Sequence, residues 1–249
     1  MIRPPLARPQ AACEEEAMFK DSTIVFDLDG TLVDTAPDLS NALNDVLTRR
    51  GHQPVSPETI RACVGHGARV MIEEALHRAG AEDDVDRMLD EFLVHYEANI
   101  AAESRPFPGA VAMLEGFSAQ DAILAVCTNK RESLSRRLLQ ELGIEGYFAA
   151  IAGRDTFAVS KPDPGHLTGT IALAGGDPSH AVMIGDSEVD VCTAKAAGIP
   201  IILVSFGYAT APLRGLSPDA MIDHYHALAG HAAALLNGVA LHPFPGLNA

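Results

Sequence analysis

The strongest constraint on the fold is an alternation of short β-rich segments with amphipathic helical segments. The β-rich segments lie at residues 22–28, 122–129, 149–156, 180–187 and 199–207. Helical periodicity occupies residues 109–119, 132–143, 164–176 and 188–198 between them. Repeated strand–helix alternation is typical of a parallel sheet with helices on both faces. The chain is therefore predicted to be an α/β protein with a Rossmann-like parallel sheet core flanked by helices.

One helical insertion interrupts this alternation after the first strand. From about residue 36 to 102 the apolar residues recur at helical spacing, and no segment has the pattern of a strand. We expect an inserted α-helical cap domain at residues 35–105. The core domain is then built from residues 21–34 and 106–249. Residues 1–20 contain Arg and Pro but no apolar signal region, and are predicted to form a disordered N-terminal extension.

Composition and net charge limit the classes of molecule that this chain is expected to bind. The net charge of −15 and the pI near 4.9 argue against binding to nucleic acid, which requires a positive surface. No apolar run approaches the roughly 18 residues that would cross a membrane. The four Cys are widely spaced without a CxxC pair, which favours reduced thiols in a cytoplasmic protein.

Polar side chains collect where the predicted strands end. In an open α/β sheet, ligands bind at the carboxyl ends of the strands, so residues far apart in sequence should converge there. The candidates at or just beyond these ends are Asp27, Asp29, Thr128, Asn129, Lys130, Lys161, Gly185, Asp186, Ser187 and Asp190.

This set of groups suits phosphoryl transfer. Several carboxylates in one pocket stay ionised only if cations neutralise them, and Lys161 supplies a single charge. Oxygen ligands favour Mg²⁺ as the second cation. One Asp could attack phosphorus while the other transfers protons. Taken singly, each piece also has an ordinary interpretation as a turn, a helix cap or a solvated loop.

In combination, these motifs resemble those of the haloacid dehalogenase superfamily. DLDGT resembles its first motif, TNK and SKP its second and third, and GDSEVD its fourth. The resemblance implies Asp27 as nucleophile, Asp29 as acid/base, and Thr128 and Lys161 as holders of the phosphoryl group. It implies Asp27, Asp29 and Asp186 as metal ligands, with Asp29 contributing its backbone carbonyl. Asp190 and Ser187 would orient the residues that hold the metal and the phosphoryl group.

The helical insertion resembles the C1 type of cap, and several stretches resemble bacterial phosphoglycolate phosphatases. These stretches are TAPDLSNALN, IRACVGHGARVMIEEAL, CTNK, GRDT and SFGY. The resemblance implies a small phosphate ester as substrate, 2-phosphoglycolate above all. Its expected binding residues are Asn129, Lys130, Gly65, His66, Gly67 and Arg69. The chain departs from the usual pattern with Arg154 in GRDT, where GGDT is common, and with SKPDPGH.

Other functions stay open from the sequence. Sugar phosphates and pyrophosphate are alternative substrates, and a phosphomutase is a further alternative. Receiver-type modules use similar groups as non-enzymatic phosphoacceptor switches, although Asp29 and the cap favour an enzyme. A monomer and a homodimer are both compatible with the chain.

Overall fold

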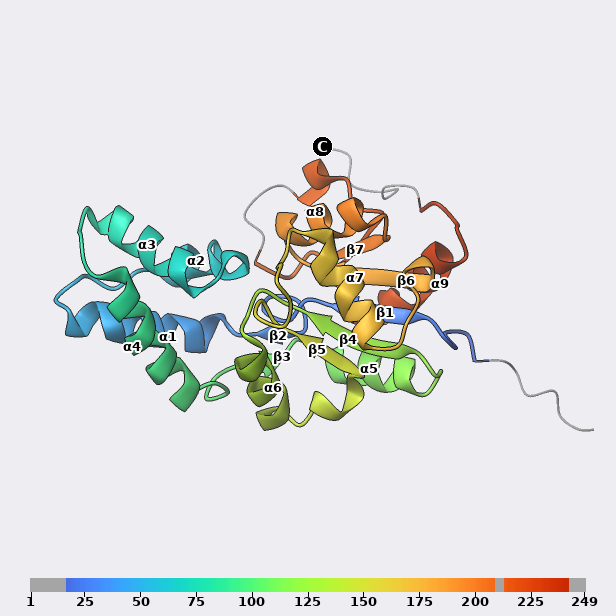
Figure 1. Cartoon of the computed structure of the whole chain (residues 1–249), viewed down its shortest axis with the longest axis horizontal. Helices are drawn as coiled ribbons and strands as arrows, with labels where there is room; N and C mark the ends of the chain where they lie inside the picture. Colours follow the sequence, from blue (N-terminus) through green and yellow to red (C-terminus); the bar gives the residue numbers. More distant parts are fainter. Residues whose placement is uncertain (1–16, 209–212, 242–249) are drawn as a thin grey trace, which may run out of the picture.

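The computed structural model describes residues 17–208 and 213–241. Figure 1 shows two lobes: a lobe of helices α1 to α4, and a larger lobe built around a sheet. The larger lobe has the predicted α/β architecture, and the helical lobe follows its first strand as the sequence indicated.

A six-stranded parallel sheet with the order β5-β4-β1-β6-β7-β8 forms the centre of the larger lobe. The strands are β1 (Thr23–Phe26), β4 (Ile123–Cys127), β5 (Ala150–Ala152), β6 (Ala181–Gly185), β7 (Ile201–Val204) and β8 (Ala220–Ile222). β1 lies between β4 and β6, so the loop after β1 emerges between the loops that follow its neighbours. This topology brings the predicted motifs to one edge of the sheet.

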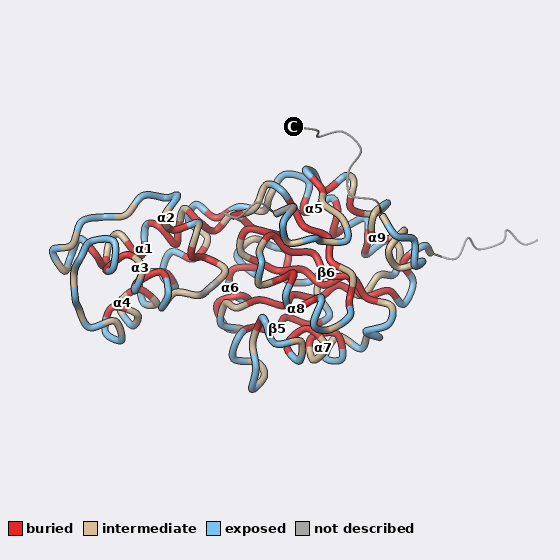
Figure 2. Tube along the Cα trace, turned by 90° about the horizontal axis from the view of Figure 1, so that it is seen from above, coloured by how far each residue is buried: buried red, intermediate tan, exposed pale blue. Residues whose placement is uncertain are grey.

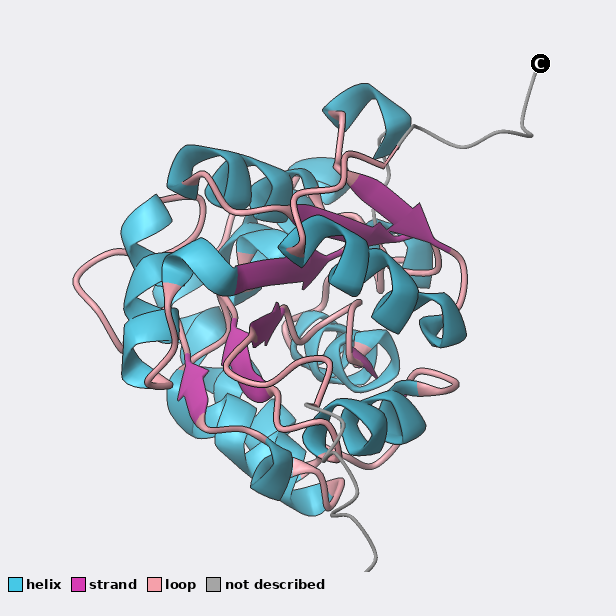
Figure 3. Ribbon diagram, turned by 90° about the vertical axis from the view of Figure 1, so that its right-hand side faces the viewer, coloured by secondary structure: helices cyan, strands magenta, loops and turns pink. Residues whose placement is uncertain are grey.

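Helices cover both faces of the sheet, as Figure 3 shows. Along β1, Ile24 and Phe26 point to one apolar cluster and Val25 to the other, because side chains alternate along a strand. The first cluster takes in α5 (Ala110–Ser118), α6 (Glu132–Glu141) and α9 (Leu228–Leu236), and the second takes in α7 (Pro164–Leu173) and α8 (Glu188–Ala197). Figure 2 shows the buried residues concentrated in the strands between these layers.

The apolar residues of the helical lobe are continuous with the first apolar cluster of the sheet. It comprises α1 (Ala36–Arg49), α2 (Pro57–Arg61), the short 3₁₀ helix η1 (Val64–His66), α3 (Ala68–Ala79) and α4 (Val85–Ala98). Ser56 and Asp84 cap α2 and α4 by accepting hydrogen bonds from backbone N–H groups of the first turn. Met88, Phe92 and Tyr96 form the buried stripe of α4.

A small antiparallel ribbon joins the lobes. The chain enters the helical lobe through β2 (Val33–Asp34) and leaves it through β3 (Arg105–Pro106), and these two strands pair with each other. The expected limits of the cap, residues 35 and 105, fall at this ribbon. We keep the division into a cap domain at 35–105 and a core domain as a proposal.

Some elements were not predicted from the sequence. β2, β3 and β8 are two or three residues long, too short for a period-two pattern to stand out. The remaining 3₁₀ helices are η2 (Glu145–Tyr147), η3 (Pro178–His180), η4 (Leu213–Leu216) and η5 (Tyr225–Ala227).

The expected N-terminal extension falls largely outside the described residues, which begin at Ala17. Residues 18–21 form a turn, and Phe19 is buried edge-to-face against Phe117, with ring centroids 4.7 Å apart. In the described part of the chain, no helix has the length and apolar character needed to cross a membrane.

Candidate active site

The loop after β1 carries the first two carboxylates. The Asp27 N–H donates to the Ile184 carbonyl of β6 (2.9 Å), which continues the ladder one residue beyond the strand. Its Oδ1 accepts from the Leu28 N–H at 2.7 Å. Gly30 turns the chain with φ +82°, and a Cβ there would lie 2.5 Å from Asp186 Oδ2. A side chain at Gly30 would therefore clash with the site itself.

Lys161 joins two of the carboxylates. Its ammonium lies 2.9 Å from Asp27 Oδ1 and 2.7 Å from Asp190 Oδ1, and its side chain is buried. Burial alone would lower the pKa of Lys161, but the charges of Asp190 and Asp27 outweigh burial and raise it. Lys161 is therefore held charged beside Asp27.

His166 positions the loop that carries Lys161. Its Nδ1 accepts from the Lys161 N–H at 3.1 Å, so Nε2 carries the proton and donates to the Gly153 carbonyl at 3.1 Å. Burial, together with the nearby Lys161, lowers the pKa of His166 to about 4. The ring is neutral at pH 7.

Asp190 supports the site from the first turn of α8. Its Oδ2 accepts from the Ser187 hydroxyl (2.6 Å) and from the backbone N–H groups of Ser187 (3.1 Å) and Asp186 (3.2 Å). Ser187 Oγ in turn accepts from the Asp190 N–H, which completes a capping box. This arrangement fixes the Gly185–Asp186–Ser187 turn, and the supporting roles expected of Asp190 and Ser187 stay predictions.

Asp186 is held by neutral donors. Its Oδ2 accepts from the Tyr208 N–H at 2.6 Å, and its Oδ1 from the Thr31 hydroxyl at 3.3 Å. Gly207 lies so close that a Cβ there would be 2.3 Å from the Asp186 Cβ. Two loops therefore pack tightly around one carboxylate.

Carboxylate oxygens of Asp27, Asp186 and Asp190 all lie within 4.8 Å of one another, and all three residues are buried. Burial raises the pKa of Asp27 to about 6, with Lys161 opposing and Asp190 adding to the shift. Burial, Asp190 and Asp27 raise the pKa of Asp186 well above its usual value. Three buried carboxylates with one ammonium carry an excess of negative charge, so the donor set fits a hard cation.

Asp29 was expected to reach the metal through its backbone carbonyl, and its carboxylate has a partner outside the triad. The Asp29 carboxylate is not part of this triad, because it pairs with Lys130, whose Nζ lies 3.0 Å from Oδ1 and 3.3 Å from Oδ2. The Lys130 ammonium also lies 4.5 Å from the centre of the Tyr96 ring. Burial lowers the pKa of Lys130, but Asp29 and Tyr96 outweigh it and raise the pKa.

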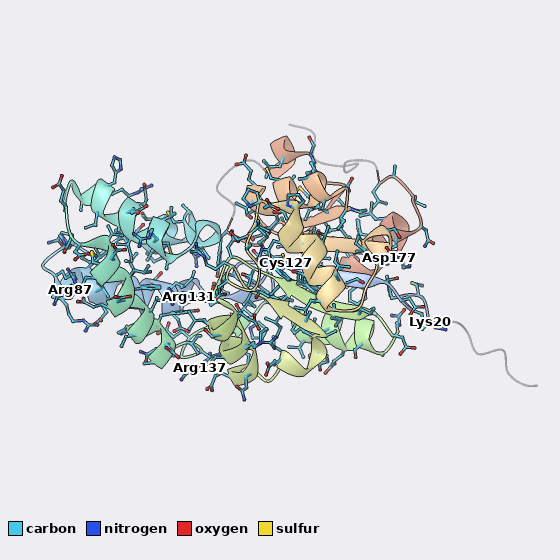
Figure 4. The ribbon with its side chains drawn as sticks, viewed as in Figure 1. Lys20, Arg87, Cys127, Arg131, Arg137 and Asp177 are labelled. Atoms are coloured by element: carbon cyan, nitrogen blue, oxygen red, sulfur yellow. The ribbon has the colours of Figure 1, made fainter. Side chains whose placement is uncertain are left out.

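Thr128 lies at the carboxyl end of β4, next to β1. Its N–H donates to the Ala152 carbonyl at 3.0 Å, and its hydroxyl accepts from the Lys130 N–H at 3.2 Å. The side chain is buried at the same sheet edge as Asp27, as the sequence predicted. Figure 4 places Cys127, the preceding residue, inside the sheet-containing lobe.

A cavity of about 710 Å³ opens on the helical side of Asp29. Residues of both lobes line it, among them Asp29, Asn129, Lys130, Tyr96, Arg131 and Arg154. Figure 4 shows Arg131 where the two lobes meet. The cavity therefore connects the catalytic edge of the sheet with the helical lobe.

The expected substrate loop of the helical lobe touches the core. The Asn129 amide donates to the Gly65 carbonyl at 3.4 Å and to the Lys161 carbonyl at 3.1 Å. A Cβ at Gly67 would lie 3.4 Å from the Arg154 guanidinium. His66 belongs to η1, beside Gly65 and Gly67.

Arg69 lines the same cavity but is engaged within the helical lobe. It pairs with Asp86 and lies 3.9 Å from Glu73, and its side chain is 45% exposed. The structure thus brings Gly65, Gly67, Asn129 and Lys130 together at the lobe junction, while Arg69 faces α4.

Three supporting residues were missed by sequence reasoning. Tyr208 was part of a noted stretch, SFGY, but nothing in sequence links it to Asp186 and to the start of α1. Its hydroxyl donates to Asp34 and accepts from two backbone N–H groups of residues 35 and 36, at 2.7 and 2.9 Å. His166 and Tyr96 were predicted only as parts of helical segments. The sequence signal that could have found these residues is a polar side chain within a segment that is expected to be buried, because such a side chain needs a hydrogen-bond partner.

Comparison with known proteins now identifies the class. Residues 24–204 match the sequence profile of the haloacid dehalogenase-like hydrolases. The chain belongs to the haloacid dehalogenase-like hydrolase family, which is the class that its α/β fold and buried carboxylate site also define.

The relatives point to one group within that family. The chain is 50% identical to a phosphoglycolate phosphatase of Mesorhizobium japonicum over 222 residues, or 88% of this chain and 98% of that protein. It is 46% identical to a phosphoglycolate phosphatase of Agrobacterium fabrum, over 82% of this chain and 89% of that protein. A solved structure of a predicted phosphoglycolate phosphatase from Haemophilus somnus superposes with a TM-score of 0.80 at 29% identity, covering 86% of this chain and 97% of that chain.

Proposed function

We propose that this hydrolase is a Mg²⁺-dependent phosphatase that hydrolyses 2-phosphoglycolate to glycolate and phosphate. The observation that carries the chemistry is the buried triad of Asp27, Asp186 and Asp190, with Lys161 paired to Asp27 and Asp190. The substrate rests on the 50% identity to a phosphoglycolate phosphatase along nearly all of that relative. A cytoplasmic location and a monomeric or dimeric state remain predictions.

The proposed reaction has two steps. A carboxylate oxygen of Asp27 attacks phosphorus, and the ester P–O bond breaks while the leaving oxygen takes a proton from Asp29. Water then attacks phosphorus and gives a proton to Asp29, and the bond between Asp27 and phosphorus breaks to release phosphate. Lys161 keeps Asp27 in position, and Thr128 donates its hydroxyl to the phosphoryl oxygens.

The metal has a limited part in this proposal. Asp27 and Asp186 would hold it, together with the backbone carbonyl of Asp29. When bound, Mg²⁺ supplies positive charge that offsets the carboxylates and the phosphoryl oxygens. Asp190 is already engaged by Lys161 and the turn before α8, so its role is to position both.

The test is phosphate release from a panel of esters with Mg²⁺ or with EDTA. The panel contains 2-phosphoglycolate, pyrophosphate and several sugar phosphates, and Asp27→Asn serves as the blank. We expect the highest kcat/KM for 2-phosphoglycolate and no turnover by the blank. A sugar phosphate or pyrophosphate in first place would refute the substrate, and full activity of Asp27→Asn would refute the mechanism.

A further inference from the structure

Lys130 and Asp29 form an ion pair whose geometry conflicts with the proposed role of Asp29 as acid/base. Both carboxylate oxygens of Asp29 lie against the Lys130 ammonium, at 3.0 and 3.3 Å. An acid/base must instead lie within hydrogen-bonding distance of the leaving oxygen, roughly 2.6–3.2 Å. The acid/base is therefore occupied, and a change of partner must precede proton transfer.

The surroundings of Lys130 restrict what can replace Asp29. The side chain of Lys130 is only 6% exposed and that of Asp29 only 12%. A buried ammonium without an anion costs several kcal/mol, so Asp29 leaves readily only if another anion arrives. No other carboxylate of the described residues is paired with Lys130.

Tyr96, in α4 of the helical lobe, covers the Lys130 ammonium with its ring. Its ring centre lies 4.5 Å from the Lys130 Nζ, and the residue is 1% exposed. A cation over an aromatic face is stabilised without forming a directed bond, so the ring leaves the ammonium free to exchange its anion. Tyr96 also lines the 710 Å³ cavity, beside Asp29 and Lys130.

We propose that Lys130 is an anion-exchange residue: the carboxylate of the substrate replaces Asp29 on its ammonium and thereby releases Asp29 for proton transfer. This inference rests on the proposed function. Thr128 and Lys130 lie two residues apart after β4, and the Lys130 backbone N–H donates to the Thr128 hydroxyl at 3.2 Å. A small molecule with a phosphoryl group at one end and a carboxylate at the other can therefore engage both.

Because of the exchange, the rate of the chemical step, and not only substrate binding, would depend on whether the ester carries a carboxylate. An ester with a neutral tail leaves Asp29 on Lys130, so its leaving oxygen lacks the acid. A substrate with a carboxylate activates the enzyme for its own turnover.

Binding tests the exchange directly. Calorimetry in Mg²⁺ compares 3-phosphonopropionate, an uncleavable analogue with a carboxylate, with n-propylphosphonate, which has a methyl group instead. Asp29→Asn removes the competitor for Lys130. We expect this variant to bind 3-phosphonopropionate roughly tenfold more tightly, as for one charge-assisted hydrogen bond, with a much smaller gain for n-propylphosphonate. Equal gains for both ligands would mean that a negative charge was removed without any exchange, and would overturn the proposal.

Turnover provides the second arm. Lys130→Met keeps the apolar stem and removes the charge, and Lys195→Met, at an exposed lysine that bonds the Leu216 carbonyl, is the matched control. We expect Lys130→Met to lower the ratio of kcat/KM for 2-phosphoglycolate to kcat/KM for ethyl phosphate roughly 10- to 100-fold. Equal losses on both esters would contradict the exchange.

The outcomes separate the two proposals. Absence of 2-phosphoglycolate turnover in the unmodified protein refutes the proposed function. Turnover of 2-phosphoglycolate with no change of preference in Lys130→Met refutes the exchange alone. If Lys130→Met does not fold, the binding comparison with Asp29→Asn decides, because that variant retains the ammonium.

Discussion

Replacing Asp186 by Asn should stabilise the metal-free protein while removing its capacity for metal-dependent stabilisation. The Asp186 carboxylate is buried, and the donors in contact with it are the neutral Tyr208 N–H and Thr31 hydroxyl. In Asp186→Asn the amide oxygen can accept from the Tyr208 N–H, and the amide nitrogen can donate to the Thr31 hydroxyl. Both hydrogen bonds therefore survive, and the charge is removed.

The size of the effect follows from the triad. Two full charges 4.8 Å apart, the limit for this cluster, repel by about 3 kcal/mol at an effective dielectric constant near 20. Asp186 faces two such carboxylates, and Lys161 offsets part of the repulsion. A net gain of about 1–3 kcal/mol corresponds to a rise in Tm of roughly 2–10 °C for a chain of this size.

The sign depends on pH. The folded pKa of Asp186 is raised, so ionisation costs stability as pH rises, and the cost disappears below its unfolded value of 3.8. The advantage of Asp186→Asn should therefore be present at pH 7 and shrink towards pH 4. Thermal unfolding in EDTA and in Mg²⁺ measures both effects, with Asp90→Asn on the exposed side of α4 as control. A lower Tm in EDTA, or an undiminished rise in Tm on adding Mg²⁺ to the variant, would refute the reasoning.

Three further predictions concern the residues around the triad. Lys161→Met should lower the free energy of unfolding in EDTA by about 3–5 kcal/mol, because the carboxylates of Asp27 and Asp190 lose their buried partner; urea unfolding measures this, and a loss below about 1 kcal/mol would contradict it. Tyr208→Phe should cost about 1–3 kcal/mol, since two backbone N–H groups at the start of α1 lose their acceptor, and amide exchange at these groups should accelerate. His166 should make the protein acid-sensitive: its pKa is about 4 when folded against 6.5 unfolded, so stability falls by about 3 kcal/mol between these pH values. His166→Gln should flatten that part of the stability–pH profile, and an unchanged slope would exclude His166 as its cause.

The layers of the fold, and the edge of the sheet at which the carboxylates collect, could be predicted from the sequence. β1, β4, β6 and β7 are continuous apolar runs, and a strand buried on both faces has that pattern. Because the carboxyl ends of parallel strands lie at one edge of a sheet, Asp27 and Asp186 could be placed at the same edge before any distance was known.

The contacts of the lobe junction could not be predicted in the same way. The Asp29 carboxylate was expected to face the substrate as an acid/base, yet it pairs with Lys130, which also contacts a ring of α4, and this depends on how the two lobes pack. Tyr208 reaches the start of α1 across most of the chain, and no periodicity records a single long-range hydrogen bond. The roles assigned to Gly65, Gly67 and Arg69 stay predictions.

The central place of β1 in the sheet also has a consequence for how the chain acquires its fold during synthesis. Thr23 pairs with Ile123 on one side and with Ala181 on the other, so the strand that carries Asp27 needs partners that are translated much later. The contacts of α1 to α4, by contrast, close within a short stretch of chain, and local contacts form fastest. The helical lobe is therefore expected to fold on the ribosome before the partner strands of β1 have been synthesised, and β1 remains an exposed apolar segment in the interval.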